Sequence, residues 1–437
     1  MKKKLICCAM SAIMVFGFCL TMTGCGSKGD SGSSDEIIKI KTVYVAEDGS
    51  DKADGSEQKP YATIAKALDE ARAGTEIIVG SGTYDSFSIS SKQSGTPDNP
   101  IILRAEDGEM PFIQGIEGSP AVSFKNVHDF VMKGFEISGG SYGIYYKSTE
   151  AAGEDGLDNI IIEDCHVHDI YGSGGICVKG ENDLAPVQGI VIDGCDLYNC
   201  YSDDNETLTI AGNIDSITVS NNTIHDNGDA GINMVGVVNG ECRDNLIYNI
   251  SDDAIAVDAG QSIKVFNNFV FNCETGVEIT SKKKSTEDET FESSGIKVRD
   301  NIIADNSECG LCFGGHGKEK GMTKDSIFCS NTLIDNHVQI GVERSTGNEI
   351  RNNLIIGGDE AIEFSDKFPE TEMDNTFGKN VWCMDEGMEI PVPANAMKKQ
   401  VSKSDRDEVL DGMTSLVEGF GSTFVPGKEA MKIYKGK

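Results

Sequence analysis

Residues Ser251–Ser281, SDDAIAVDAGQSIKVFNNFVFNCETGVEITS, contain the same apolar frame twice, first as AIAVD and then as GVEIT. Each copy carries a carboxylate, Asp258 in the first and Glu278 in the second, at a different point of the frame. Apolar residues alternate with other residues in both copies, and a period of two is typical of β-strands. The stretch therefore predicts two strands that are equivalent in their buried positions and different in their outward ones.

The frame recurs through the middle of the chain with a shortest spacing of 22 or 23 residues. This period suits one coil of a β-solenoid and is too short for the common helical repeats. A leucine-rich repeat is the main alternative, but its fixed Leu positions and helix-like return are missing. We predict that an Asn ladder forms at one turn of the solenoid. The residues that lead the successive copies are Cys165, Cys195, Asn222, Asn245, Asn268, Asn301, Asn331 and Asn353.

Aligning the coils on their alternating runs predicts which side chains share a column, because successive strand residues point to opposite faces. Two columns are expected to be buried: Ile144, Ile176, Leu208, Ile232, Ile255, Val277 and Leu311, and Tyr146, Val178, Ile210, Met234, Val257, Ile279 and Phe313. Two columns are expected to face outward: Tyr145, Cys177, Thr209, Asn233, Ala256, Glu278 and Cys312, and Lys147, Lys179, Ala211, Val235, Asp258, Thr280 and Gly314.

The segments before and after the repeats predict caps for the solenoid. Residues 42–115 contain strands and an amphipathic helix around Ala65 to Ala73, residues 116–365 hold the repeats, and residues 366–437 form a C-terminal capping tail. From about residue 42 to 365 the chain resembles bacterial right-handed parallel β-helix proteins of the pectin-lyase-like class. The resemblance implies an all-β fold with a small N-terminal capping helix.

The first 25 residues, MKKKLICCAMSAIMVFGFCLTMTGC, have a Lys-rich start, a short apolar run and a terminal Cys25. They resemble a bacterial lipoprotein signal, in which this Cys becomes the lipidated first residue; the alternative is an ordinary signal peptide. Residues 26–41 begin with GSKGDSGSSDE, which is typical of a flexible tether. We therefore expect an exported protein at the cell surface, bound to the membrane through its lipid anchor only.

The formal charge of −33, with only 38 Lys and Arg, argues against nucleic acid as a partner. It also disfavours a polyanionic substrate unless a cation intervenes. The 14 Cys are scattered outside any compact disulfide pattern, so we interpret most of those beyond the signal as small buried residues. Cys309 and Cys312 form a CxxC pair, but no helix follows them as a redox motif requires.

The two carboxylates of the opening stretch fall in adjacent outward columns, one coil and two residues apart. With about 4.8 Å between strands and about 6.6 Å for two residues, their Cα atoms should lie roughly 8 Å apart, within reach of a glycosidase carboxylate pair. IAVD followed by GVEIT resembles the segments of glycoside hydrolase family 120 β-xylosidases that carry the nucleophile and the acid/base. The resemblance implies that Asp258 is the nucleophile and Glu278 the acid/base; the alternative is a chance pair on an exposed acidic face.

Four further residues are expected to contact substrate. Tyr145 and Asn233 belong to the outward columns, whereas Lys282 and His316 lie on loops that interrupt the repeat. Insertions on one face of a solenoid usually line its binding groove. Solvated loop charges are the alternative interpretation of Lys282 and His316.

A second group of acids suggests calcium. Asp229, Asp252 and Asp253 precede strands in GDAGI and SDDAI, which resemble the calcium-binding segments of family 9 pectate lyases. Two departures weaken a lyase mechanism: Ala256 stands where a further acid is expected, and Glu278 where the basic residue is expected. The alternative is that these acids only form turns.

We therefore predict an exported lipoprotein that cleaves glycosidic bonds in an extracellular polysaccharide or oligosaccharide, as a retaining hydrolase that needs no cofactor. Two alternatives stay open. One is a Ca²⁺-dependent polysaccharide lyase, and the other is a β-helix that binds glycan or acts as an adhesin without catalysis.

Overall fold

The computed structural model describes residues 41–153, 157–201, 206–281, 292–315, 321–384, 397–398 and 419–436. Cys25, Lys282 and His316 lie outside the described residues. In the part of the chain that the structure describes, no helix combines the length and apolar character needed to cross a membrane.

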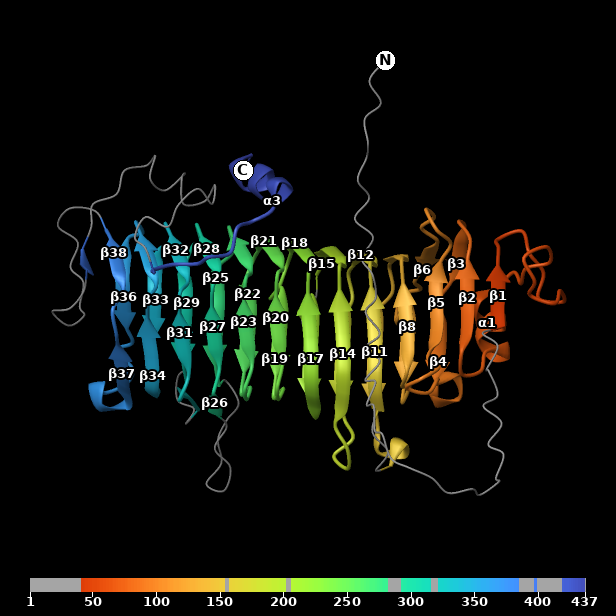
Figure 1. The fold of residues 1–437 in the computed structure, drawn as a ribbon, viewed down its shortest axis with the longest axis horizontal. Helices are drawn as coiled ribbons and strands as arrows, with labels where there is room; N and C mark the ends of the chain where they lie inside the picture. Colours follow the sequence, from red (N-terminus) through yellow and green to blue (C-terminus); the bar gives the residue numbers. More distant parts are fainter. Residues whose placement is uncertain are drawn as a thin grey trace, which may run out of the picture. The chain divides into compact units, whose positions relative to one another are not determined.

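Three parallel sheets form the fold, and each regular coil contributes one strand to each sheet (Figure 1). The strands of one coil are β11 (Leu157–Glu163), β12 (His166–Ile170) and β13 (Gly174–Gly180). Each pairs with the equivalent strand of the next coil, which is β14 (Val187–Asp193), β15 (Asp196–Cys200) or β16 (Leu208–Gly212). The chain therefore winds as a parallel β-helix, which confirms the predicted all-β solenoid.

Sheet 1 has 15 strands in the order β1-β2-β5-β8-β11-β14-β17-β20-β23-β27-β31-β34-β30-β26, with β37 paired to β34. Its strands are β1 (Lys41–Val45), β2 (Thr75–Val79), β5 (Ile101–Ala105), β8 (Phe130–Lys133), β11 (Leu157–Glu163), β14 (Val187–Asp193), β17 (Ile214–Ser220), β20 (Glu241–Arg243), β23 (Lys264–Phe266), β26 (Glu292–Ser294), β27 (Lys297–Arg299), β30 (Met322–Lys324), β31 (Ile327–Cys329), β34 (Ser345–Arg351) and β37 (Met373–Phe377).

Sheet 2 has 11 strands and carries the predicted acidic columns. Its strands, in spatial order from the N-terminal coil, are β4 (Phe87–Ser90), β7 (Val122–Lys125), β10 (Tyr142–Ser148), β13 (Gly174–Gly180), β16 (Leu208–Gly212), β19 (Ile232–Val235), β22 (Asp253–Asp258), β25 (Thr275–Thr280), β29 (Cys309–Gly314), β33 (Val338–Val342) and β36 (Glu360–Phe364).

Sheet 3 has 13 strands, again in chain order. They are β3 (Thr83–Asp85), β6 (Phe112–Gln114), β9 (Glu136–Ser138), β12 (His166–Ile170), β15 (Asp196–Cys200), β18 (Thr223–Asn227), β21 (Leu246–Ile250), β24 (Phe269–Phe271), β28 (Ile302–Ala304), β32 (Thr332–Ile334), β35 (Leu354–Ile356), β38 (Val381–Cys383) and β39 (Met397–Lys398).

The helical elements are short. They are α1 (Ile64–Glu70), α3 (Lys428–Lys435) and the 3₁₀ turns η1 (Ser91–Gln93), η2 (Glu150–Ala152) and η3 (Glu370–Glu372). The helix predicted around Ala65 to Ala73 is α1, in which the Thr63 side chain accepts a hydrogen bond from the Lys66 backbone N–H. It ends at Glu70 because Ala71 is already extended.

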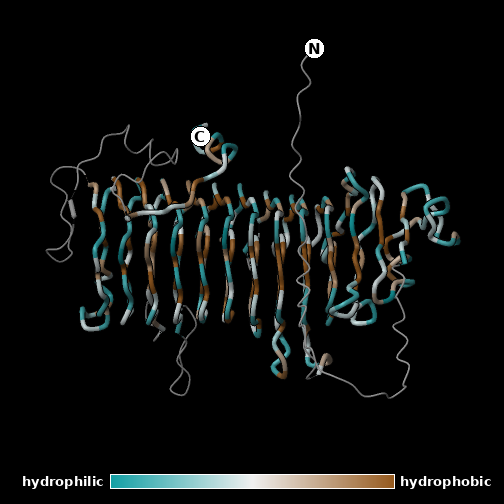
Figure 2. The backbone as a smooth tube through the Cα atoms, viewed as in Figure 1, coloured by the Kyte–Doolittle hydropathy of each residue, from teal (hydrophilic) through white to brown (hydrophobic). Residues whose placement is uncertain are grey.

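The core is the space enclosed by the three sheets. The two columns predicted to be buried are in register from β10 to β29 and lie almost wholly within it. Figure 2 shows the alternation of apolar and polar residues along the strands that produces this arrangement. Eight of the ten Cys among the described residues are buried, as expected for small apolar residues.

The predicted Asn ladder is confirmed. Between neighbouring coils, each ladder Asn donates its backbone N–H and Nδ2 to the Oδ1 of the next, from Asn222 onward to Asn245 and Asn268, at 2.9–3.1 Å. The ladder continues to Asn380. Because these amides are buried and paired, the turn between sheets 1 and 3 recurs at the same point of each coil and holds the coils in register.

Within the C-terminal tail, β37 and β38 extend sheets 1 and 3, whereas residues 419–436 pack on the outer face of sheet 3. Met431 and Tyr434 of α3 belong to an apolar cluster with Phe269 and Phe271 of β24. Tyr434 also donates a hydrogen bond to Asp305 Oδ2 at 2.6 Å. The helix therefore covers apolar side chains that point away from the solenoid core.

Candidate functional site

The outward face of sheet 2 contains the predicted site, and its register is as predicted. The columns from Tyr145 to Cys312 and from Lys147 to Gly314 pair strand by strand without a slip. In the central pair of strands, Ala256 lies opposite Glu278 and Asp258 lies opposite Thr280. Asp258 and Glu278 are thus one coil and two residues apart, which by strand geometry places their Cα atoms roughly 8 Å apart.

Glu278 is less exposed than its place in the sequence indicates. The pattern predicts an acid on an exposed sheet face, but only 5% of Glu278 is accessible. Its side chain points away from the solenoid core and lies against the wall of a cavity, where neighbouring side chains shield it. Asp258 is half-buried. The pair therefore combines a shielded carboxylate with a more accessible one.

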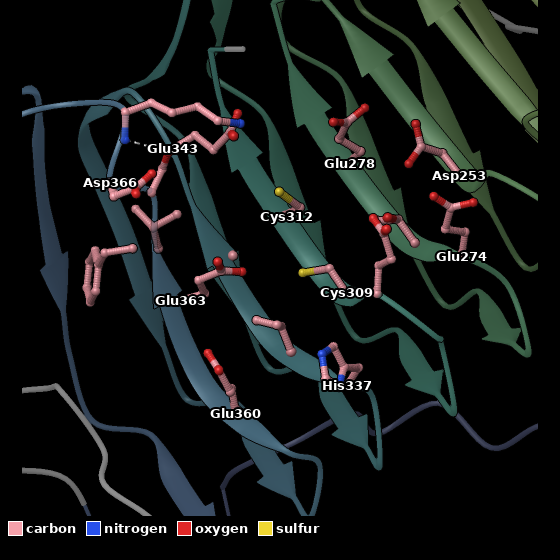
Figure 3. A pocket seen from close by; sticks show the side chains of 18 of the residues that line it. Asp253, Glu274, Glu278, Cys309, Cys312, His337, Glu343, Glu360, Glu363 and Asp366 are labelled. Carbon is pink, nitrogen blue, oxygen red and sulfur yellow. Dashed lines mark hydrogen bonds between the residues drawn. The ribbon is translucent and has the colours of Figure 1, made fainter. Parts of the chain in front are cut away.

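The cavity has a volume of about 770 Å³ and opens over strands β22 to β36 of sheet 2. Figure 3 shows Glu278, Cys312 and Glu363 along its floor, with Asp253 and Glu274 at one end. Glu278 lies beside Cys312, and Gly341 lies beside Glu363, in one outward row. The volume is sufficient for a small oligosaccharide segment.

Acidic side chains dominate the cavity, and Lys367 and His337 are the basic residues among those that line it. Burial, followed by the carboxylates of Glu308, Asp252 and Asp253, raises the pKa of Glu274. The elevated pKa therefore reflects burial first and repulsion between neighbouring acids second. The acidic residues of the cavity are Asp252, Asp253, Glu274, Glu278, Glu308, Glu343, Glu360, Glu363 and Asp366.

The CxxC pair lies on the cavity floor. Both sulfur atoms pack over Gly341, where an added Cβ would lie 3.2 Å from Cys309 Sγ and 3.1 Å from Cys312 Sγ. The adjacent Cys309 thiol, burial, and the carboxylates of Glu278 and Glu343 all raise the pKa of the Cys312 thiol. A thiol held in its protonated form is a poor nucleophile, so these residues shape the floor and Gly341 keeps it open.

Two predicted substrate contacts lie on coils before the cavity. Asn233 Nδ2 donates to Glu206 Oε1 at 2.6 Å, and Thr209 Oγ1 donates to Glu206 Oε2 at 3.0 Å. Tyr145 stacks on Tyr142 with ring centroids 4.8 Å apart, and burial raises its pKa to about 12, so its phenol is neutral. Sequence reasoning missed Glu206 because it precedes the alternating run and has no repeat position.

The calcium-type acids lie at the starts of two neighbouring strands of sheet 2, β19 and β22. Asp253 opens β22 and is buried, Asp252 before it is exposed, and Asp229 is half-buried ahead of β19. Their oxygen donors suit Ca²⁺ chemically. Within the described ranges, however, no group of three or more His, Cys, Asp or Glu side chains is arranged to hold a metal ion.

The chain is similar to known proteins both in sequence and in fold. A family model described as a Pel9A-like, right-handed β-helix region matches residues 43–338. The uncharacterized protein YwoF of Bacillus subtilis is 27% identical over 386 residues, which cover 78% of this chain and 80% of YwoF. Pectate lyase PEL9 of Emericella nidulans is 36% identical over 119 residues, 24% of this chain and 29% of that protein.

Among solved structures, the GH136 lacto-N-biosidase from Eubacterium ramulus has a TM-score of 0.52 at 12% identity. The match covers 83% of this chain and 68% of that protein. This similarity concerns the fold. Together with the family match, it confirms the predicted right-handed parallel β-helix.

Proposed function

The chain belongs to the Pel9A-like right-handed β-helix family, and from this premise we propose that it cleaves glycosidic bonds in an extracellular polysaccharide. The observation that carries the proposal is the diagonal placement of Asp258 and Glu278 on neighbouring strands of sheet 2, with Glu278 lining an open cavity and Asp258 outside its lining. We assign the reaction to retaining hydrolysis, because side chains on Cα atoms roughly 8 Å apart can lean together to the short carboxyl separation of a retaining pair, one on each side of an anomeric carbon.

In the proposed reaction the Asp258 carboxylate attacks the anomeric carbon while the bond to the leaving-group oxygen breaks. Glu278 donates its proton to that oxygen, so the leaving sugar departs as a neutral alcohol. Water then enters, Glu278 takes its proton, and the resulting hydroxide displaces Asp258 from the glycosyl-enzyme. Tyr145 and Asn233 are proposed to hold sugar units on earlier coils, with Lys282 and His316 as further contacts from their loops.

A Ca²⁺-dependent lyase is the second candidate, and the sequence match to pectate lyase PEL9 favours it. In that case Asp229, Asp252 and Asp253 would hold the ion, and the ion would supply positive charge for a uronate carboxylate. The two reactions differ in their products, because a lyase leaves a 4,5-unsaturated uronate and a hydrolase leaves a plain reducing end.

We also propose that the protein is exported and anchored to the membrane through a lipid on Cys25. A Cys25→Ala variant should then appear in the culture medium, whereas the wild-type protein stays with the membrane fraction. Equal distribution of the two proteins would contradict the anchor.

The proposed roles of Asp258 and Glu278 predict different failures on substitution. Asp258→Ala should lose activity on every substrate, about 10²–10⁴-fold or more, because no glycosyl-enzyme forms. Glu278→Ala should retain activity on aryl glycosides whose leaving group needs no proton, and added azide should yield a glycosyl azide. A panel of plant and host polysaccharides supplies the substrate, and mass spectrometry identifies the products.

Glu363→Ala is the matched control, since Glu363 lines the same cavity two strands beyond Cys312. It should keep wild-type activity on short aryl glycosides. Full activity in both dyad variants, or unsaturated products, would contradict the hydrolase.

A further inference from the structure

Residues 419–436, called the C-terminal strap below, run back along the outer face of sheet 3 (Figure 1). The backbone hydrogen bonds of the strap step from one coil to the coil before it. The Gly421 N–H donates to Asn352 O at 2.8 Å, at the turn that leads into β35. The Ser422 N–H donates to Thr332 Oγ1 of β32, also at 2.8 Å. The strap therefore crosses the strands of sheet 3 and joins successive coils.

Two further coils are joined by the side chains of the strap. Ser422 Oγ donates to Asp300 O at 2.6 Å, at the turn that leads into β28. The Tyr434 ring of α3 packs on β24, with its centroid 5.1 Å from that of Phe271 and 5.4 Å from that of Phe269. The contacts thus extend over four consecutive coils, those of β35, β32, β28 and β24. Three strand intervals separate the first coil from the last, or about 14 Å.

The outer face of sheet 3 becomes apolar in the coils that the strap crosses. One outward column begins with the polar residues Glu136, His166, Asp196 and Thr223. The same column continues as Leu246, Phe269, Ile302, Thr332 and Leu354. Phe269, Ile302 and Leu354 point away from the core, yet each is at most 2% exposed, and they share an apolar cluster with side chains of the strap. The sequence of the solenoid is therefore adapted to a docked strap.

The coils that the strap joins are the coils that form the cavity. In the chain, β24, β28, β32 and β35 of sheet 3 each lead into a strand of sheet 2, namely β25, β29, β33 and β36. All four of these sheet 2 strands contribute lining residues to the cavity. In the described part of the chain, β36 is also the last strand of sheet 2. The cavity therefore lies at the end of the solenoid, with the strap on the adjacent sheet of the same coils.

The end of a repeat fold is where local opening is expected first. A terminal coil has a neighbour on one side only, so fewer contacts oppose its separation from the stack. The strap adds contacts between the coil of β35 and β36 and the interior coil of β24. Its docking should therefore raise the free energy needed to open the coils that form the end of the cavity.

We propose that the C-terminal strap is a conformational clamp for the cavity. With the strap docked, the coils of β33 and β36 stay in register and the cavity keeps its shape. With the strap released, these coils open locally and the end wall of the cavity is lost, while the coils before β24 stay folded. This inference concerns the shape of the cavity and does not rest on the proposed function.

The test uses Met431→Asp in the full-length protein. Met431 belongs to the apolar cluster under the strap and is 9% exposed, so a carboxylate at this position should detach α3. Hydrogen exchange measured by mass spectrometry should then be at least 10-fold faster in β33 and β36 and unchanged in β10 and β13. Trp382, the only Trp of the chain, is buried in β38, and acrylamide should quench its fluorescence more strongly in the variant.

Lys432→Asp is the matched control, because it places the same side chain one residue further along α3, where Lys432 is 77% exposed. Its exchange and quenching should equal those of the wild type. Fast exchange in α3 with wild-type protection of β33 and β36 would overturn the proposal, since the strap would then cover sheet 3 without holding the cavity.

Tyr434→Phe decides the question if Met431→Asp unfolds the whole chain. It keeps the ring on β24 and removes the hydrogen bond to Asp305 Oδ2. Exchange should be at least 2-fold faster in β33 and β36 than in the wild type, again with β10 and β13 unchanged. Wild-type exchange in β33 and β36, or an equal increase in β10 and β13, would contradict a clamp that acts on the cavity coils.

Discussion

At the scale of single residues, His225 in a stack of rings on the outer face of sheet 3 makes a pH-dependent contribution to stability. Tyr198, His225 and Tyr248 stack with nearly parallel rings. His225 Nδ1 lies 2.7 Å from Asp226 Oδ2, and Nε2 lies 3.3 Å from Asp196 Oδ1. Burial disfavours the charged imidazole, but the two carboxylates outweigh burial and raise the pKa of His225.

The elevated pKa of His225 predicts how its contribution depends on pH. A group whose pKa is higher in the folded state stabilises the fold fully below its unfolded pKa, near 6.5, and loses that contribution as pH rises through the folded value. The free energy of unfolding of the wild type minus that of His225→Gln should therefore decline from pH 6 to pH 8. Urea titrations of both proteins measure it, and a difference that is constant or rises with pH would contradict the assignment.

One residue of the Asn ladder, Asn245, shows how much a buried amide contributes to the stability of the fold. Asn245 Oδ1 accepts from Asn222, and Asn245 Nδ2 donates to Asn268 Oδ1 at 2.9 Å. Asn245→Ala should lower the free energy of unfolding by about 1–3 kcal/mol for each buried polar group left without a partner. Gln188→Ala, at an exposed position of β14, should change it little. Equal effects in urea titrations would show that the ladder adds no stability.

At the scale of secondary-structure elements, the starts of the sheet 2 strands gather acids that repel one another. Asp252 and Asp253 lie at the start of β22, and both contribute to the raised pKa of Glu274. A divalent cation would relieve this repulsion and would bind only the folded state, so it would stabilise the fold by mass action.

If this strand end binds calcium, 5 mM CaCl₂ should raise the melting temperature above that in NaCl of matched ionic strength. Asp252→Ala with Asp253→Ala should remove the increment. Asp374→Ala, on sheet 1, should retain it. An identical melting temperature in CaCl₂ and NaCl would remove the lyase alternative and leave these acids as turn formers.

At the scale of the whole molecule, the formal charge of −33 destabilises the folded state through long-range repulsion between its negative charges. Salt shortens the range of this repulsion, to about 10 Å at 0.1 M. Raising NaCl from roughly 0.02 to 0.5 M at pH 7 should therefore increase the melting temperature. The increment should shrink near pH 4.5, the isoelectric point. A melting temperature that falls with salt at pH 7 would indicate that ion pairs outweigh net repulsion.

The sequence by itself determined the coil, the columns and the Asn ladder. Alternation sets which side chains face the core, and the recurring Asn at the turn between sheets 1 and 3 holds each coil in the same register. The alternation and the recurring Asn together set the pairing of β22 with β25. In that pairing, Ala256 lies opposite Glu278 and Asp258 lies opposite Thr280. The diagonal placement of the carboxylate pair was therefore predictable from a short stretch of chain.

The tertiary structure alone decided the surroundings of that pair. Glu343, Glu360 and Glu363 join the cavity from β33 and β36 or the turn beside them, beyond insertions that break the shortest period. The columns predicted from the sequence end at Gly314 of β29, so the acids of these later strands lie beyond them. Shielding likewise depends on atoms from several coils at once, so the 5% exposure of Glu278 arises only when strands distant in the chain are stacked around it.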